Sequence, residues 1–565
     1  MRCLGRPSLV VATLLLLLDS TACRRSSAAA QHPRTVQTAA ARSSASTPTG
    51  FIVISLDTLR ADRLGAYGYD RPTTPFLDRL AARATLFERA IVQYPGTLQS
   101  HMSMFTGLYP REHAVFPPAL RLSADIPTLP ELFHAAGYRT AGHSEGGFVK
   151  GYYGFSRGFD EWDDPDHVAA TDLERTLAAG RDFLRRLEPG ERFFLFLHTY
   201  ALHDPYTPPV RYRRMFWQGP PPPGAFPPTG PELARVNERG PVPSEPVVAW
   251  LSALYDASLR YTDDQLAAFV GDLERSGLLA TTTLVVTSDH GEEFLEHGHL
   301  SHVETYEETL HVPLLVLRPG QKTGQRVESL VESIDLAPTL LELAGLPAPP
   351  MSGRSYAAAL QNPATPLRSE AFAEGESWYG GIGRALYRTA GRELLQLVHT
   401  RPLAEPDGSW VSRELRFDTE ASRLDLEAVS FAEARQVELS IDGVARPPLT
   451  LDTEWRSLTL DLGPPAVRRI SLRAAACRSP QELGQGSDPR CLSFKLRGTE
   501  GDRVELFDLT ADRRGILDLS RLRADDTRTM LATLRKVVHT LRSPAQNGTL
   551  EKEHERTLRT LGYLR

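Results

Sequence analysis

The chain has 565 residues, and 64 Lys and Arg against 70 Asp and Glu give a formal net charge of −6. Hydrophobic residues make up 41% and charged residues 24%, which is ordinary globular usage and excludes a chain that is disordered throughout. A pI near 6.3 argues against a dedicated nucleic-acid binder, because such proteins usually carry a basic excess. The length fits one large α/β domain with an appended module as well as several smaller domains.

The N-terminus has the features of an export signal. Arg2 and Arg6 precede an apolar run, Leu9–Leu18, which is too short to span a membrane comfortably. Small residues then lead to Cys23, which allows two interpretations: a bacterial lipoprotein signal with a lipidated Cys23, or an ordinary cleaved signal peptide. We therefore expect residues 1–23 to be a signal peptide and the protein to be exported to the periplasm, outer membrane or cell surface. A lipid on Cys23 would anchor it to a membrane.

Residues 24–49 are rich in Ser, Ala, Thr and Arg and predict a flexible linker. Beyond them, apolar and amphipathic runs alternate. Strands are predicted at residues 51–56, 138–141, 193–197, 283–287 and 312–317, and helices from Pro75 (with Thr74 as its N-cap) and at 98–105, 129–136, 172–187, 247–274 and 336–344. This alternation predicts an α/β fold: a mostly parallel sheet with helices on both faces and a ligand site at the carboxyl ends of its strands. Prolines at 217–245 predict a long loop.

The spacing of apolar positions along the chain changes near residue 412. Residues 412–500 alternate apolar and polar positions, and Asp442-Gly443 is a hairpin turn signal, so we expect an antiparallel, sandwich-like β module inserted here. Cys477 and Cys491 form an isolated late pair, which suits a disulfide in an oxidising compartment.

Three strand-end clusters carry candidate chemistry. Asp57 ends the strand at 51–56, Thr97 stands just before the helix at 98–105, and Asp289 and His290 follow the strand at 283–287. Each also has an ordinary interpretation: a turn aspartate, a helix N-cap and a polar loop. Together they predict one divalent cation, Zn²⁺, Mn²⁺ or Ca²⁺, held by Asp57, Asp289 and His290 and also bound by the Thr97 oxygen. The cation would lower the hydroxyl pKa, so that Thr97 could attack an ester phosphorus or sulfur.

Histidines near these clusters are candidates for catalysis and substrate binding. His203 follows the strand at 193–197, and His302 lies in a short histidine-rich run with His297 and His299. We expect His203 and His302 to bind the ester oxygens or protonate the leaving group. His143 is a further substrate-binding candidate. The alternative is that these are solvated loop histidines.

At this point the motifs resemble the sulfatase branch of the alkaline phosphatase/sulfatase superfamily. The resemblance covers about residues 50–400 and a tail near 500–520. It rests on Leu56-Asp57-Thr58-Leu59-Arg60-Ala61-Asp62, Thr73-Thr74-Pro75, Thr106-Gly107-Leu108-Tyr109-Pro110, Ser288-Asp289-His290-Gly291-Glu292, Tyr306-Glu307-Glu308 and Val504-Glu505-Leu506-Phe507-Asp508-Leu509. It implies a sulfatase-like catalytic domain at 50–400, with residues 501–565 supplying a C-terminal strand in a small antiparallel sheet and helices that complete the domain.

The sequence departs from the family pattern at the nucleophile. Sulfatases carry Cys or Ser, in a frame with Pro and Arg, at the position ten residues before Gly107, and oxidise it to formylglycine; here Thr97 stands in that place, so no formylglycine is expected. Thr is what the phosphodiesterases and the phosphoethanolamine or phosphoglycerol transferases of the superfamily use. Thr58 replaces a second metal Asp, and His302 and His143 occupy positions where sulfatases have Lys. The ligand set resembles that of the one-metal members.

These observations predict an exported, metal-dependent hydrolase that cleaves phosphate or sulfate esters of a small molecule, glycan or lipid through a covalent Thr97 intermediate. Two alternatives remain: an envelope transferase that moves a phospho-headgroup, and a binding protein on a sulfatase scaffold that has lost catalysis.

Overall fold

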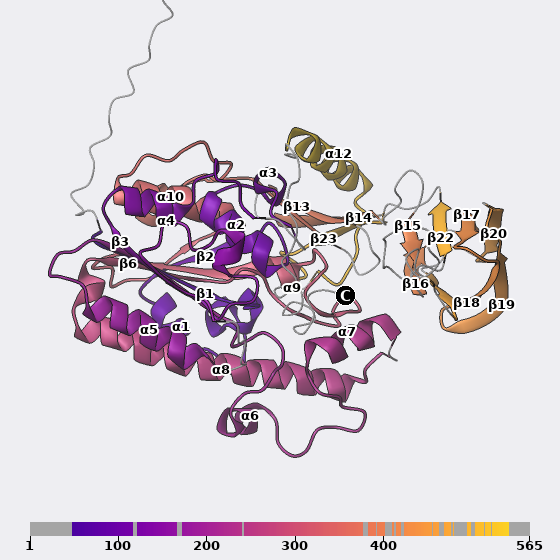
Figure 1. Ribbon diagram of the computed structural model, residues 1–565, viewed down its shortest axis with the longest axis horizontal. Coiled ribbons are helices and arrows are strands. Elements are labelled where there is room, and N and C mark those ends of the chain that lie inside the picture. The colour runs from indigo at the N-terminus through magenta and orange to yellow at the C-terminus, as the bar shows by residue number, and fades with distance from the viewer. Residues whose placement is uncertain are drawn as a thin grey trace, which may run out of the picture. The chain divides into compact units, whose positions relative to one another are not determined.

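The computed structural model describes residues 48–116, 121–165, 172–239 and 242–376, and residues 382–541 with gaps, the longest at 479–493 (Figure 1). Cys23, Cys477 and Cys491 lie outside the described residues, so lipidation and the disulfide stay predictions. No helix among the described residues combines the length and the apolar character needed to cross a bilayer.

Within these residues, nine strands form the main sheet. Its order is β10-β2-β9-β6-β1-β5-β3-β4, and β11 also pairs with β2. The strands are β1 (Gly50–Leu56), β2 (Thr85–Ile91), β3 (Arg139–His143), β4 (Glu161–Asp163), β5 (Phe193–Thr199), β6 (Thr282–Thr287), β9 (His311–Leu317), β10 (Gln325–Val327) and β11 (Val331–Glu332). All pairs are parallel except those that β9 makes with β2 and β6. The prediction of a mostly parallel sheet is therefore confirmed.

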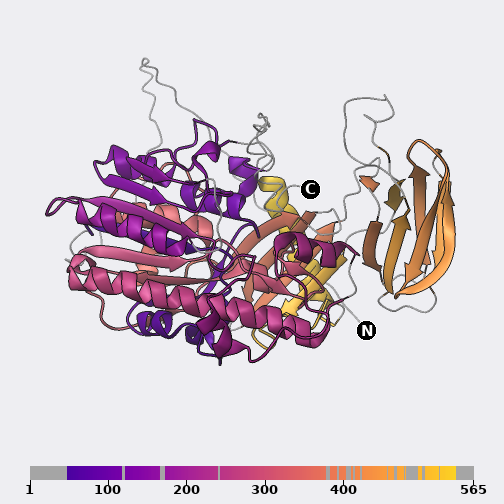
Figure 2. The same cartoon turned by 60° about the horizontal axis from the view of Figure 1, so that its bottom comes forward.

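Helices cover both faces of this sheet (Figures 1 and 2). Successive residues of β1 point to opposite faces, so Phe51 and Val53 enter one apolar core and Ile52 and Ile54 the other. The first core contains side chains of α2 (Thr97–Thr106), α4 (Leu129–Ala135) and α10 (Leu336–Ala344), and the second those of α1 (Pro75–Ala81), α5 (Leu173–Arg185) and α8 (Glu245–Arg275). Because both faces are covered, all seven residues of β1 are buried.

Two of the differences from the sequence prediction concern β2 and the segment at 217–245. β2 was not predicted because Glu88 and Arg89 interrupt its apolar run, and its pairing with β9 shifts register between Phe87 and Ala90. The predicted loop at 217–245 contains a helix, α7 (Gly230–Arg239), whose one proline, Pro231, stands in its first turn, where proline is tolerated. Four short helices complete this part: α3 (Pro110–His113), α6 (Val210–Phe216), α9 (Glu307–Leu310) and α11 (Ala357–Gln361). A two-stranded ribbon joins β7 (Glu293–Phe294) and β8 (Leu300–Ser301).

A second, antiparallel sheet joins distant parts of the chain. Its order is β12-β13-β14-β23, so the late strand β23 (Arg503–Asp508) pairs with β14 (Glu393–Arg401). The other strands are β12 (Glu370–Glu376) and β13 (Ile382–Ala390). Helix α12 (Ala524–Thr540) packs on this sheet through Met530 and Leu534.

Residues between β14 and β23 form two further four-stranded antiparallel sheets. Their orders are β15-β22-β17-β20 and β16-β21-β18-β19, with β15 (Ser409–Val411), β16 (Glu414–Thr419), β17 (Arg423–Ser430), β18 (Arg435–Ile441), β19 (Val444–Leu451), β20 (Arg456–Asp461), β21 (Arg468–Ala474) and β22 (Phe494–Gly498). Ala428 and Leu460 from one sheet share an apolar core with Val437 and Ile470 from the other. Two antiparallel sheets around one core make a β-sandwich.

The start of α1 gives a stability prediction. Thr74 makes no capping hydrogen bond, and its hydroxyl donates to Asp78 instead. The cap comes from α8: the fully buried Asp263 carboxylate accepts the Phe76 and Leu77 N–H groups at 2.7 and 2.8 Å. We expect Asp263→Ala to lower the free energy of unfolding by about 1–3 kcal/mol, because two donors lose their acceptor in the interior.

Denaturant unfolding measures this loss. The matched control is Asp264→Ala on the same helix, whose carboxylate is more exposed and bonds Arg260 and Tyr212, so its loss should cost less than about 1 kcal/mol. Equal stabilities of the two variants would show that the Asp263 carboxylate does not stabilise the N-terminus of α1.

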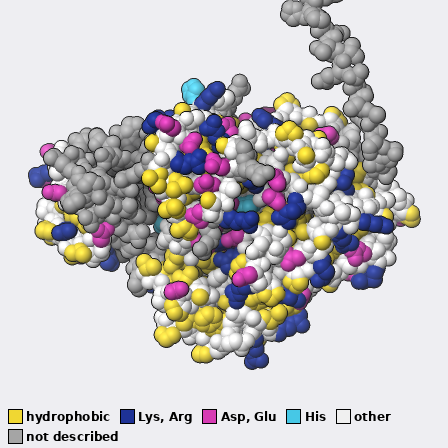
Figure 3. Space-filling model, turned by 180° about the vertical axis from the view of Figure 1, so that it is seen from behind, with side chains coloured by type: hydrophobic (Ala, Val, Ile, Leu, Met, Phe, Trp, Pro, Cys, Tyr) yellow, Lys and Arg dark blue, Asp and Glu magenta, His cyan; other side chains and the backbone are white. Residues whose placement is uncertain are grey.

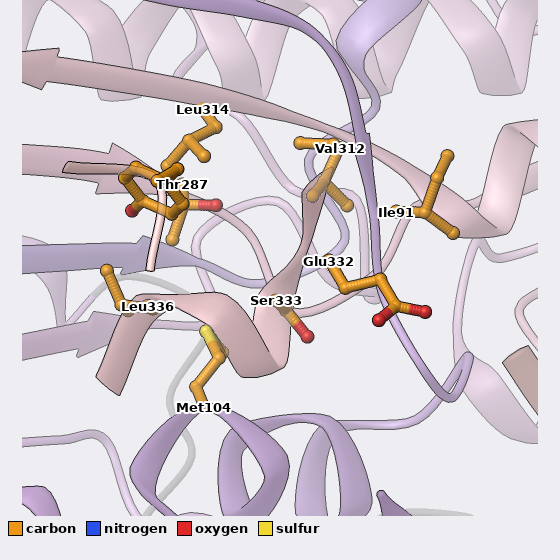
Figure 4. A pocket seen from close by; sticks show the side chains of 10 residues that line it. Ile91, Met104, Thr287, Val312, Leu314, Glu332, Ser333 and Leu336 are labelled. Carbon is orange, nitrogen blue, oxygen red and sulfur yellow. The ribbon is translucent and has the colours of Figure 1, made fainter. Parts of the chain in front are cut away.

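One small cavity is lined in part by Thr287, the last residue of β6, two positions before Asp289. It has a volume of about 10 Å³ and apolar walls that include Ile91, Val312, Leu314 and Leu336 (Figure 4). This is room for about one water molecule, not for an ester substrate.

On the face shown in Figure 3, acidic and basic side chains are interspersed, so this face presents no broad electrostatic field of one sign.

Candidate active site

Parallel strands bring the predicted residues to one edge of the sheet. β1, β5 and β6 are neighbours in parallel register, with Ser55 opposite both His198 and Thr287. Asp57 therefore leaves the sheet beside Asp289 and His290, and all three side chains are completely buried. The expectation of a site at the carboxyl ends of the strands matches this placement.

Thr97 points into this cluster from α2. It is the first residue of the helix, with Gly96 as N-cap, rather than the residue before it. Its Oγ1 lies 3.2 Å from Asp57 Oδ2 and 3.2 Å from His290 Nε2. The nucleophile candidate and the ligand candidates thus meet at one point, where the N-terminus of α2 also favours negative charge.

The donor atoms fit a divalent cation. Among the described residues, Asp57 Oδ1 and Asp289 Oδ2 are buried oxygens without a hydrogen-bond partner. Ligand atoms of Asp57, Asp289 and His290 all lie within 4.8 Å of one another, and His290 Nε2 is 3.4 Å from Asp289 Oδ2. A tetrahedral ion with bonds of 2.0–2.1 Å separates its ligands by about 3.3 Å. These three residues therefore form a candidate metal group, and the Thr97 oxygen lies at a matching distance.

Electrostatics support the same assignment. Burial and the neighbouring Asp289 raise the pKa of Asp57 well above its ordinary value. Burial also acts on Asp289, but His290, His101 and His198 outweigh it and hold the pKa of Asp289 below its ordinary value. Two adjacent carboxylates in a dry site repel each other, which a bound cation would relieve.

His203 and His302 lie next to the candidate metal ligands. The ring of His302 is 4.3 Å from that of His290 and 5.0 Å from that of His203. Burial opposes protonation of His203, but Asp204 and Asp57 raise its pKa to about 9. Burial and the neighbouring His203 lower the pKa of His302 to about 3. The arrangement therefore pairs a charged imidazolium with a neutral imidazole, which suits acid–base work.

Two further histidines from the sequence analysis have other neighbours. His143 ends β3 at the same edge of the sheet, opposite Leu197, and its charged neighbours are Asp163, Glu161 and Arg175, so its role in substrate binding stays a prediction. His297 bonds the Glu308 carboxylate and stacks on a tyrosine ring, as a packing residue does. Of the predicted substrate-binding residues, the structure brings His203 and His302 to the cluster.

Sequence reasoning missed two residues at the site, His101 and His198. His198 Nε2 is 3.3 Å from Asp57 Oδ2, and His101 Nδ1 is 3.5 Å from Asp289 Oδ2. Each had a signal: His198 is a lone polar side chain in the buried strand Phe193–Thr199, and His101 follows Thr97 by four positions, one helical turn.

Fold and site together define a class: α/β proteins with a buried hydroxyl beside a cluster of carboxylates and imidazoles at the strand ends. The Sulfatase family model matches residues 49–346, so the chain belongs to the sulfatase family. It is accordingly an ester hydrolase of the alkaline phosphatase superfamily, a family whose reactions cleave sulfate or phosphate esters.

Similar proteins agree with this assignment. Arylsulfatase K of Mus musculus is 24% identical over 412 residues, which cover 65% of this chain and 73% of the relative. A structure solved in complex with its substrate D-glucosamine-2-N,6-O-disulfate is 17% identical with a TM-score of 0.57, covering 87% of this chain and 98% of that one. The phosphonate monoester hydrolase of Agrobacterium radiobacter is 15% identical with a TM-score of 0.53, covering 87% and 95%. The two solved structures share the fold.

Proposed function

We propose that this protein is a metal-dependent hydrolase that cleaves phosphate esters, and less readily sulfate esters, through a covalent Thr97 intermediate. One observation carries the proposal: the Thr97 hydroxyl lies 3.2 Å from both a carboxylate and an imidazole of the candidate metal group. A divalent cation held by Asp57, Asp289 and His290 would supply Lewis-acid stabilisation of the negative charge that develops there.

In the first half of the reaction, Thr97 Oγ1 attacks phosphorus in line with the leaving oxygen. Asp57 Oδ2, which already accepts the Thr97 hydroxyl at 3.2 Å, takes the hydroxyl proton. The Oγ–P bond forms while the bond from phosphorus to the leaving oxygen breaks. His203 donates a proton to that oxygen, since Asp204 and Asp57 keep its imidazole protonated.

In the second half, water attacks the phosphothreonine. The neutral His302, whose Nδ1 is held 3.1 Å from Glu292 Oε1, accepts a proton from this water. The Oγ–P bond then breaks, and Thr97 regains the proton that Asp57 held. Transfer of the proton from His302 to His203, whose rings are 5.0 Å apart, or its exchange with solvent, restores both histidines, and the cycle closes without an aldehyde.

The absence of a formylglycine residue predicts the substrate preference. An aldehyde hydrate can expel sulfate by elimination, whereas a threonine ester must be cleaved by water. We expect kcat/KM for bis(p-nitrophenyl) phosphate to exceed that for p-nitrophenyl sulfate by at least about tenfold, because attack at phosphorus relies mainly on positioning and charge stabilisation.

Steady-state rates with the two esters, the phosphate monoester and a phosphonate monoester test this preference on one preparation. Efficient sulfate-ester hydrolysis with hardly any phosphoester hydrolysis would overturn it. A wholly inactive protein that still binds metal would favour the alternative of a scaffold without catalysis. The two unpaired carboxylate oxygens weigh against that alternative, since a retained binding fold has no need of them.

We also propose that the protein is exported and that its substrate is a glycan or lipid ester of the cell surface. The apolar run Leu9–Leu18 and Cys23 motivate the first part. A sulfated amino sugar bound by a protein of the same fold supports the second. A mature chain that retains Met1 in the cytoplasm would contradict export.

A further inference from the structure

Two histidines that have no role in the proposed reaction contact the carboxylates of the candidate metal ligands. His101 is in α2, His198 is in β5, and both side chains are completely buried. Their rings are 4.6 Å apart and nearly perpendicular, at 89°. Phe196 and Phe155 meet the His101 ring edge-on at 6.0 and 6.3 Å, so aromatic side chains surround this inner pair.

His198 faces one of the two carboxylates. Its Nε2 is 3.3 Å from Asp57 Oδ2, the same oxygen that lies 3.2 Å from the Thr97 hydroxyl. Its other nitrogen, Nδ1, has no hydrogen-bond partner in the part of the chain that the structure describes. The polar contact of this ring is therefore directed at Asp57, and it fixes the oxygen that we propose to take the nucleophile's proton.

His101 faces the other carboxylate and connects three segments. Its Nδ1 donates to the Thr97 carbonyl oxygen at 2.8 Å and lies 3.5 Å from Asp289 Oδ2, a charge contact rather than a hydrogen bond, and its Nε2 is 2.9 Å from Ser55 Oγ. Ser55 lies in β1 two residues before Asp57. One side chain thus contacts the strand, the helix and the loop that carry the candidate ligands.

These histidines could instead be ligands of a second cation, since His101, His198 and Asp289 also place ligand atoms within 4.8 Å of one another. The hydrogen bonds of His101 argue against this. A carbonyl oxygen only accepts, so Nδ1 of His101 carries a proton and has no lone pair for a cation. Its Nε2 lone pair faces the hydroxyl of Ser55.

We propose that His101 and His198 are positioning residues that hold Asp289 and Asp57 in the orientation needed to bind the cation. The inference rests on the proposed function, because it assumes that these carboxylates bind a metal. Partners that orient ligands in this way typically change metal affinity by 10–100-fold when they are replaced. Because both groups lie behind the ligands, their loss should weaken the metal site without removing a ligand.

The test compares apolar and amide replacements of similar size on the full chain. His198→Leu and His101→Leu are each expected to weaken Zn²⁺ affinity about 10–100-fold, measured by competition with a chromogenic chelator, with one ion still bound at saturation. His198→Gln can place an amide N–H near the Nε2 position, and His101→Asn can place one near Nδ1. Both amide variants should recover most of the affinity.

His113→Leu is the matched control. His113 is equally buried and bonds Ser103 Oγ at 3.2 Å, but no contact with a ligand residue is recorded. It should lose stability and keep its Zn²⁺ affinity. Unchanged affinity in both site variants, an equal loss in His113→Leu, or two ions per wild-type chain with one lost in His198→Leu would overturn the inference. A wild-type chain that binds no Zn²⁺, Mn²⁺ or Ca²⁺ would instead refute the proposed function beneath it.

Discussion

Thr97→Ala is expected to lower kcat/KM for bis(p-nitrophenyl) phosphate by at least about a hundredfold, which is the loss expected when an activated nucleophile is removed. Thr97 is 2% exposed, and its hydroxyl lies 3.2 Å from one carboxylate oxygen and 3.2 Å from one imidazole nitrogen. No other hydroxyl is recorded at hydrogen-bond distance from both groups among the described residues. Metal content should stay close to that of the wild type, since three ligands remain.

Two variants separate the nucleophile from its surroundings. Thr97→Ser keeps the hydroxyl and should retain most of the activity. Ser100→Ala removes a hydroxyl one helical turn further on, which donates to the Asp289 carbonyl at 2.6 Å, so we expect a much smaller loss. A rapid acid quench of the wild type during turnover should trap the phosphorylated chain. Locating the phosphate on Thr97 identifies the intermediate directly. Near-normal turnover by Thr97→Ala would rule out the covalent mechanism.

The positions of Asp57, Asp289 and His290 could be predicted from the sequence for a general reason. Each follows an apolar run that forms a strand of a parallel sheet, and parallel strands end at one edge. Thr97 could be added because the helix that it begins starts at the same edge. The family motifs supported these positions independently of the strand pattern.

Other contacts could not be predicted because they depend on pairings far apart in the chain. The cap of α1 comes from Asp263, 187 positions after Phe76, and no local pattern indicates it. His198 is opposite Ser55 only because β5 pairs with β1 in that register. A buried histidine in an apolar strand is usually a core residue, and only its distance from Asp57 shows its relation to the site.

Replacing Asp289 and His290 together by Ala is expected to abolish metal binding and to lower activity as strongly as a chelator does, by at least about a hundredfold. These residues contribute two of the three ligands in the candidate group, so a single remaining carboxylate, Asp57, would hold the ion weakly. Metal analysis of the dialysed proteins measures the loss. Unchanged metal content in the double variant would show that the ligands are misassigned.

Thermal unfolding separates lost metal from lost fold. A cation that binds only the folded chain stabilises it, so a chelator should lower the Tm of the wild type. In the metal-free state, Asp57 and Asp289 remain buried side by side, and the pKa of Asp57 is raised by burial and by Asp289. Asp289→Asn removes this repulsion, so the metal-free variant should unfold at or above the Tm of the metal-free wild type, and a chelator should not change its Tm. A chelator-dependent Tm in Asp289→Asn equal to that of the wild type would place the cation elsewhere.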